Sequence, residues 1–165
     1  MLTRSVQDLK LVTKVLTDDG TFPNNAQLPL LVYPQVWRPD VTGLSTRIRK
    51  RFAKNHWGGS WVNGVFSYHH YHSTAHEVLS VCAGQAEIQL GGDMGLRQVV
   101  QIGDVVVIPA GVAHKNLGSS PDFSVVGAYP RGQSPDLCYG HADERPRTDK
   151  TIAALPLPDY DPVYG

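Results

Sequence analysis

Residues 64–84 of this chain read Gly64-Val-Phe-Ser-Tyr-His-His-Tyr-His-Ser-Thr-Ala-His-Glu-Val-Leu-Ser-Val-Cys-Ala-Gly84, and residues 103–114 read Gly103-Asp-Val-Val-Val-Ile-Pro-Ala-Gly-Val-Ala-His114. The two blocks contain four side chains of types that bind metals: His70, His72, Glu77 and His114. His70 and His72 are two residues apart, so on a β-strand both imidazoles point to the same side of the sheet. Residues 73–75 predict a turn after which Glu77 opens the returning strand, and Pro109-Ala-Gly111 predicts a turn that brings His114 to the same pocket.

The chemistry of these four side chains favours a transition metal. Three neutral imidazoles and one carboxylate suit one divalent ion such as manganese, iron, nickel or zinc. Calcium and magnesium fit less well, because they prefer shells made of oxygen. An octahedral ion with four protein ligands keeps two open positions for water, substrate or dioxygen.

The remaining pattern is typical of an all-β protein. The 16 glycines and 12 prolines are spread along the chain and separate short apolar runs, as in a sandwich or barrel. The clearest predicted strands are residues 77–82, 86–90, 96–102, 104–108 and 123–128, with 28–33 as a weaker candidate and a hairpin turn at 91–95. One short helix is predicted at about 43–55, because Leu44, Ile48 and Phe52 recur at i, i+4 and i+8.

Length and composition exclude several classes of protein. The 165 residues fit a single domain, 1–165, in which 1–42 form an N-terminal arm and 130–165 a proline-rich, extended C-terminal tail. The 15 basic and 15 acidic side chains cancel, so we expect no nucleic-acid or membrane partner. No apolar run approaches the ~20 residues that span a bilayer, and Asp8 and Lys10 interrupt the position of a secretory signal. We therefore expect a cytoplasmic protein with a small-molecule ligand and with Cys82 and Cys138 reduced.

The two blocks resemble the motifs of the cupin superfamily, G-x5-H-x-H-x4-E-x6-G and G-x5-P-x-G-x2-H-x3-N. The first motif is matched at all its fixed positions: Gly64, His70, His72, Glu77 and Gly84. The second is matched up to its last position: Gly103, Pro109, Gly111 and His114. Gly118 stands where the motif has asparagine. That asparagine is not usually a ligand, so the departure affects the expected local turn and not the expected metal site. The motifs cover residues 64–116, and the wider sequence, from Asn63-Gly-Val-Phe to Gly127-Ala-Tyr-Pro130, is similar to small bacterial single-domain cupins of the YjlB type.

This resemblance implies a double-stranded β-helix, or jelly-roll barrel, with a metal in its mouth held by His70, His72, Glu77 and His114. It also implies a homodimer with arms or strands exchanged between subunits. The alternative is a cupin scaffold whose histidines line a polar pocket without metal. We favour the metal, because metal-free relatives usually lack one of the ligands.

Other side chains near the first block have two readings each. His69 and Tyr71 alternate with the proposed ligands and should face the opposite side of the strand. His76 points away from the pocket if the strand has begun, and reaches the metal or its entrance if the turn is longer. The segment Trp57-Gly-Gly-Ser-Trp61, together with Phe66 and Tyr68, could form an aromatic wall beside the pocket, but core packing is the commoner role of such aromatics.

Two functions from different classes fit the sequence. The first is a metal-dependent enzyme, oxygenase-like or isomerase-like, acting on a small oxygen-rich metabolite, with His76, Tyr68 or a metal-bound hydroxide as the base. The second is a non-catalytic, metal-dependent module that binds or senses a small molecule. A purely structural protein is the weakest reading. Substrate and reaction depend on the pocket lining and do not follow from the fold.

Overall fold

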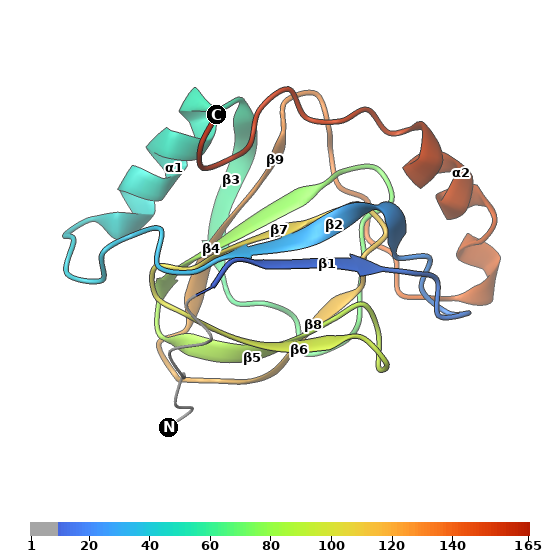
Figure 1. Ribbon diagram of the computed structural model, residues 1–165, viewed down its shortest axis with the longest axis horizontal. Helices are drawn as coiled ribbons and strands as arrows, with labels where there is room; N and C mark the ends of the chain where they lie inside the picture. Colours follow the sequence, from blue (N-terminus) through green and yellow to red (C-terminus); the bar gives the residue numbers. More distant parts are fainter. Residues whose placement is uncertain (1–9) are drawn as a thin grey trace.

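Two antiparallel sheets that face each other make up the fold (Figure 1), described for residues 10–165 by a computed structural model. The six-stranded sheet has the order β1-β2-β7-β4-β9-β3, and the three-stranded sheet has the order β6-β5-β8. The strands are β1 (Val12–Leu16), β2 (Asn25–Tyr33), β3 (Trp57–Asn63), β4 (Glu77–Ala83), β5 (Gln85–Leu90), β6 (Leu96–Gln101), β7 (Val105–Ile108), β8 (His114–Ser119) and β9 (Ser124–Pro130). The predicted all-β, jelly-roll architecture is confirmed.

Alternating side chains of the six-stranded sheet build two cores. Leu79, Val106 and Val125 point inward and pack with Ile88 and Val100 of the smaller sheet. Their sequence neighbours, among them Val78, Val105 and Val126, point outward and are buried as well. The central strands are therefore apolar on both faces, as residues 105–108 predict.

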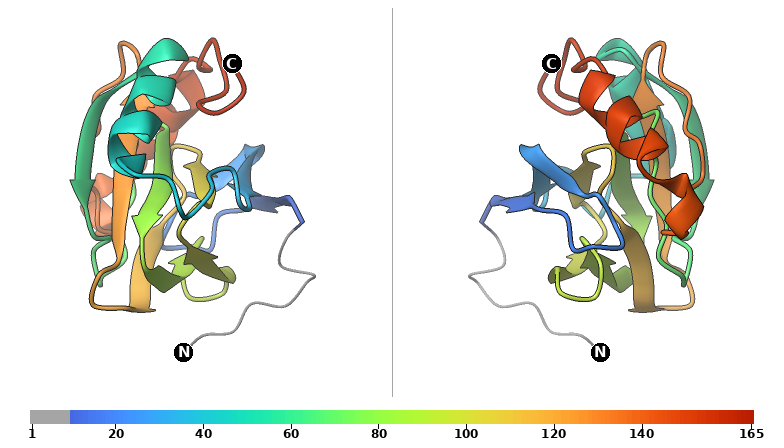
Figure 2. Two further views of the ribbon diagram at one scale, coloured as in Figure 1. Left: turned by 90° about the vertical axis from the view of Figure 1, so that its left-hand side faces the viewer. Right: turned by 90° about the vertical axis from the view of Figure 1, so that its right-hand side faces the viewer.

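The outer face of the six-stranded sheet is buried because α1 (Leu44–Lys54) covers it. Leu44, Ile48 and Phe52 form the buried stripe of this helix and pack against the outward valines. The predicted helix is confirmed almost to the residue. Figure 2 shows both helices and the C-terminal segment on the side of the six-stranded sheet, away from β5 and β6.

The proline-rich end of the chain is more structured than the sequence indicates. It contains a short 3-10 helix, η2 (Ala142–Glu144), and a second helix, α2 (Arg147–Ala154), so the prediction of a single helix is wrong. Beyond α2 the chain crosses the outer face of the sheet, where Trp57 Nε1 donates to the Tyr160 carbonyl at 2.9 Å. The Tyr33 hydroxyl donates to Asp161 Oδ2 at 2.7 Å, and Val163 is buried.

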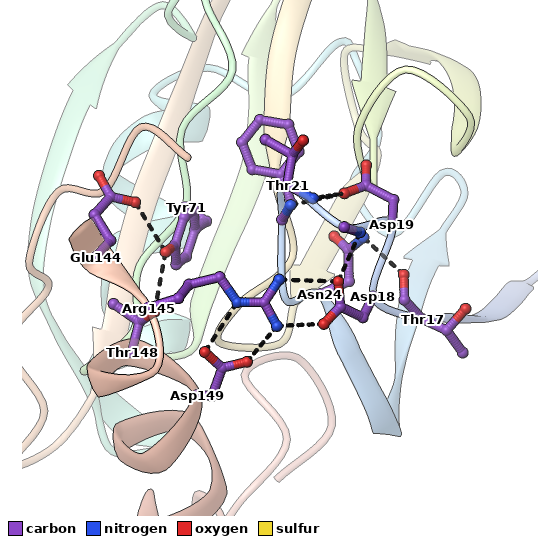
Figure 3. A network of polar contacts seen from close by, with 12 residues as sticks. Thr17, Asp18, Asp19, Thr21, Asn24, Tyr71, Glu144, Arg145, Thr148 and Asp149 are labelled. Atoms are coloured by element: carbon purple, nitrogen blue, oxygen red, sulfur yellow. Dashed lines mark hydrogen bonds and ion pairs between the residues drawn. The ribbon is translucent and has the colours of Figure 1, made fainter. Parts of the chain in front are cut away.

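Arg145 ties α2 to the loop after β1 (Figure 3). Its guanidinium donates to Asp149 Oδ2 and to Asp18 Oδ1, each at 2.9 Å. The hydrogen bond from Arg145 lowers the pKa of Asp18 below its usual range. Arg145 thereby joins the C-terminal segment to the loop between β1 and β2.

Two further sequence expectations bear on the fold. Neither Cys82 nor Cys138 forms a disulfide. Within residues 10–165, no helix has the length and apolar character needed to cross a membrane.

Candidate metal centre

The four predicted ligands come from three segments of the chain. Glu77 is the first residue of β4 and His114 is the first residue of β8. His70 and His72 lie on an extended segment that forms only two isolated bridges, His70 to His114 and Tyr71 to Cys138. The predicted strand through His70 and His72 is thus reduced to two single-residue bridges, although both imidazoles still line one pocket.

The turn between His72 and Glu77 is held by Asp136, sixty residues further along the chain. Its Oδ1 accepts from the Ser73 amide at 2.6 Å and from the Thr74 amide at 3.2 Å, and its Oδ2 accepts from the Ser73 hydroxyl. These contacts outweigh burial and lower the pKa of Asp136. An ionised carboxylate therefore fixes the turn that places His72 and Glu77.

A second turn places His114. The Val112 amide donates to the Pro109 carbonyl at 3.1 Å, and Gly111 has φ 92°. A Cβ at Gly111 would lie 2.3 Å from the Asn24 carbonyl oxygen. Only glycine fits this backbone without strain, which is the physical reason for its place in the second block.

The side chains meet in a pocket of about 220 Å³ between the two sheets. Single ligand atoms of His70, His72 and His114 all lie within 4.8 Å of one another. Glu77 joins them, because its Oε2 lies 3.4 Å from His72 Nε2 and 3.1 Å from His114 Nε2. The rest of the lining consists of Trp61, Asn63, Gly64, Val65, Phe66, Leu79 and Tyr129.

Each histidine presents the same ring nitrogen to the backbone. His70 Nδ1 lies 3.2 Å from the Tyr68 carbonyl, His114 Nδ1 lies 3.1 Å from the Val112 carbonyl, and His72 Nδ1 contacts the Asp136 carbonyl. A carbonyl can only accept, so Nδ1 carries the hydrogen in all three rings. The Nε2 lone pairs are left for the pocket, which is how metal-binding histidines are usually oriented.

This arrangement leaves a buried cluster of acceptors. With Nδ1 protonated, the Nε2 atoms of neutral His72 and His114 are acceptors, and both face Glu77 Oε2. This carboxylate oxygen is also an acceptor, is buried and has no hydrogen-bond partner. Acceptors at this spacing repel one another unless a proton or a cation lies between them. A divalent ion would satisfy all of them at once, so the residues present fit a metal.

The electrostatics of the pocket favour the ligand protonation states of His70 and Glu77, whereas in the absence of a metal Glu77 favours a protonated His72. Burial, together with the nearby His114, lowers the pKa of His70 to about 3, so this imidazole is neutral at pH 7. Burial acts to raise the pKa of Glu77, but the close His114 and His72 imidazoles outweigh it and hold the pKa of this carboxyl well below its usual range. For His72, burial opposes the charged form, yet the contact with Glu77 outweighs it and raises the pKa.

The structure does not bring His76 into this pocket. Its Nδ1 accepts from the Ala110 amide at 2.9 Å, and its ring faces a separate cavity of about 280 Å³ between β2 and α2. Burial lowers the pKa of His76. His69 also points elsewhere, with Nε2 2.9 Å from Asp93 Oδ1.

Tyr71 faces away from the pocket, as its alternation with the ligands predicts, and is fully buried (Figure 3). Its hydroxyl donates to Glu144 Oε2 at 2.9 Å and lies 3.2 Å from Thr148 Oγ1 of α2. Its amide donates to the Cys138 carbonyl, also at 2.9 Å. The residue between the two histidines is therefore anchored to the C-terminal segment.

Of the aromatic residues considered above, Trp61 and Phe66 line the pocket, and Tyr68 is outside the lining with its ring stacked on Phe66. Trp57 is buried in the core between the six-stranded sheet and α1 and takes no part in the pocket. Tyr129 was missed as a pocket residue. Its hydroxyl accepts from Trp61 Nε1 at 2.8 Å, and burial, with Glu77 nearby, raises its pKa, so it stays protonated at neutral pH. Its inward direction depends on the register of β9 against β3, which the local sequence does not reveal.

Comparison with known proteins finds a matching family and a relative that aligns over most of the chain. The family described as Cupin matches residues 62–131. "Uncharacterized protein YjlB" of Bacillus subtilis (strain 168) is 46% identical over 153 residues, which are 93% of this chain and 90% of that protein.

Solved structures resemble the chain more distantly. The epimerase RmlC from Legionella pneumophila Philadelphia 1, crystallised with dTDP-4-keto-L-rhamnose, has a TM-score of 0.40 at 13% identity, covering 92% of this chain and 86% of that one. Procruciferin, an 11S globulin from Brassica napus, also has a TM-score of 0.40, at 18% identity over 74% of this chain and 30% of that one. At these values neither likeness supports an inference about this chain.

Proposed function

Since this chain belongs to the cupin family, we propose that His70, His72, Glu77 and His114 hold one divalent transition metal, manganese, iron, nickel or zinc, and that this centre acts on a small molecule. The observation that carries the proposal is the orientation of the imidazoles. Three Nδ1 atoms donate to backbone carbonyls, so three Nε2 atoms converge beside an ionised Glu77. Such a donor set suits a transition metal better than calcium or magnesium.

The enzyme is the function we favour. When bound, the metal would supply Lewis-acid chemistry or, as Fe(II), chemistry with dioxygen. Trp61, Val65, Phe66 and Leu79 limit water in the pocket, and Trp61 orients the Tyr129 phenol. Tyr129 stays protonated, so it can donate a hydrogen bond or a proton to an oxygen of a substrate. An oxygenase-like or isomerase-like reaction is compatible with these groups.

The second candidate is a metal-dependent module that binds or senses its ligand without turning it over. It is favoured by the scarcity of proton-transfer groups, because His76 faces another cavity and Tyr68 is outside the pocket lining. Apart from the four ligands, Tyr129 is the one titratable side chain in the lining among residues 10–165.

Incubation of the Fe(II) and Mn(II) forms with a metabolite extract under air distinguishes the two functions. The enzyme predicts that a compound is consumed, with oxygen uptake if the reaction is oxidative, and that turnover is lost in His114→Ala. Tight retention of one compound, recovered unchanged, would contradict the enzyme and support the binding module.

We also propose a homodimer. Among the described strands, β1 is an edge of the six-stranded sheet, and Leu11 just before it and Val15 within it are 55% and 44% exposed. An edge strand presents backbone groups that can pair with a second chain. Sedimentation velocity should give twice the chain mass, and Val15→Lys should shift the protein toward monomer; a wild-type monomer would contradict the dimer.

A further inference from the structure

A row of exposed aromatic rings leads out of the candidate metal pocket. Phe66 lines the pocket and stacks on Tyr68, with ring centroids 4.8 Å apart and planes 14° apart. Tyr139 continues the row 5.9 Å from Tyr68. The residues come from the segment after β3 and from the C-terminal segment, so two distant parts of the chain build it. We call Phe66, Tyr68 and Tyr139 the aromatic row.

The aromatic row is both exposed and next to a proposed ligand. Phe66 is 50% exposed, and Tyr68 and Tyr139 are each 43% exposed. The His70 ring lies 5.1 Å from Phe66 and 5.9 Å from Tyr68. Single exposed apolar residues are ordinary on protein surfaces, but a contiguous set beside a pocket marks a binding surface.

The pocket lining narrows the chemistry of a ligand. Across residues 10–165, no lysine or arginine lines this pocket, so the lining offers no cationic side chain to pair with a phosphate or a polyanion. Besides the proposed ligands, Asn63 and Tyr129 are the polar side chains of the lining, and Trp61, Val65, Phe66 and Leu79 make apolar walls. A heavily hydroxylated ligand would leave many of its hydroxyls without partners here.

We propose that the aromatic row is a ring-binding platform, and that the ligand of this site joins a small oxygen-chelating group to an aromatic ring. The chelating group occupies open positions on the metal, and the ring lies against Phe66 and Tyr68. This inference rests on the proposed metal site. It goes beyond it by assigning the ligand class, an aromatic hydroxy or keto acid, and by giving Tyr68 a role in specificity.

Three acids with the same 2-hydroxy acid head test the platform on the Ni(II)-loaded protein by titration calorimetry. Lactate carries the head alone, 3-phenyllactate adds a phenyl ring, and gluconate adds a polyhydroxy tail. We expect 3-phenyllactate to bind about tenfold more tightly than lactate, and gluconate no more tightly than lactate.

Variants locate the gain in the aromatic row. Tyr68→Ala and Tyr139→Ala should each reduce the preference for 3-phenyllactate by about threefold to tenfold and leave lactate binding unchanged. Tyr68→Phe keeps the ring and should keep the preference, which separates stacking from a role of the hydroxyl. Tyr164→Ala is the matched control, because Tyr164 is 70% exposed and packs on Tyr33, away from the pocket.

Metal content, measured on every sample, separates the two proposals. If nickel does not bind, the metal site is wrong and the ligand assignment falls with it. If nickel binds but 3-phenyllactate and lactate bind equally, or the preference survives both alanine variants, the platform is wrong while the metal site stands. Tighter binding of gluconate would replace the aromatic ligand by a carbohydrate-like one and overturn the inference.

Discussion

The two halves of the candidate metal centre are held in different ways. Glu77 and His114 open β4 and β8, so the backbone ladders of the two sheets position them. His70 and His72 lie on a segment with isolated bridges, and contacts from Asp136, Cys138 and α2 position that segment. The first half depends on the barrel. The second half is also bonded to the barrel, through the backbone pair His70–His114 and the Gly111 amide that donates to the His72 carbonyl, and it depends on the C-terminal segment in addition. Variants can therefore test the contribution of the C-terminal contacts to the metal site separately from that of the strands.

The largest expected effect is the loss of a ligand, and it should be equal in both halves. Glu77→Gln and His72→Ala each remove a donor, so metal affinity should fall by more than about a hundredfold, beyond the usual effect of outer-shell changes. Elemental analysis and competition with a chelator measure this. His76→Ala is the control and should retain the metal, because His76 faces another cavity. Unchanged metal content in both ligand variants would mean that the ligand set is misassigned.

Removal of the Tyr71 hydroxyl should weaken the support of the segment with His70 and His72 and leave that of Glu77 and His114 unchanged. Tyr71→Phe deletes the hydrogen bond to Glu144, which should cost about 1–2 kcal/mol of unfolding free energy. Since Tyr71 separates His70 from His72, metal affinity should also fall, by about threefold to tenfold.

Tyr33→Phe is a matched control for this change. It removes a similar bond from a tyrosine to Asp161 of the same C-terminal segment, but on the outer face of the sheet. We expect a similar loss of stability with unchanged metal affinity. Equal losses of metal affinity in the two variants would refute separate support of the second half.

The pH dependence of stability should identify Glu144 as part of this support. Burial acts to raise its pKa, but the amides of Tyr139 and Gly140 and the Tyr71 hydroxyl outweigh it, so the folded pKa is lowered. A lowered pKa gives stability that is present above the unfolded value of about 4.3 and is lost as pH falls through the folded value.

Glu144→Gln should therefore destabilise the metal-free protein at pH 7 by about 1–3 kcal/mol, and this difference should shrink toward pH 3. Urea unfolding at a series of pH values measures it. Asp143→Asn, exposed on the same short helix, should change little at any pH. A difference that stays constant with pH would contradict the role of the ionised Glu144.

The smallest effect is expected at the outer link between α2 and the first loop. Asp18→Asn weakens the ion pair with Arg145 at the surface, where such pairs contribute about 0–1 kcal/mol. The free energy of unfolding should fall slightly, and the loss should be smaller in about 1 M salt, which screens the ion pair. Metal affinity should not change. A measurable loss of metal would extend the support of His70 and His72 to this surface contact.

The difference between the halves also explains what the sequence predicts. β5 and β7 are predicted well because each has a local apolar pattern: β5 alternates apolar and polar residues, and β7 is a continuous apolar run that is covered on both faces. β3 and β8 were missed, since Trp57-Gly-Gly-Ser-Trp and His-Lys-Asn-Leu-Gly-Ser lack that pattern. α2 was missed because Thr148 is its buried residue, so it has no apolar stripe to read.

The site shows the same limit. The spacing of the two blocks is a local property, and the structure brings those four side chains into one pocket. The carbonyl of Asp136, which orients His72, is 64 residues further along the chain. The hydroxyl of Tyr129 comes from β9, far along the sequence from the motif block that supplies His70, His72 and Glu77. Contacts at such separations follow from the fold and leave no signal in the local sequence.

The central claim is that one metal ion bridges the two halves, and crystals of the nickel-loaded protein test it most directly. Anomalous diffraction at the nickel edge should give one peak per chain, about 2.0–2.2 Å from Nε2 of His70, His72 and His114 and from an oxygen of Glu77. A peak that includes Glu77 and His114 but leaves out His70 and His72, a peak at another site, or no peak would contradict the account.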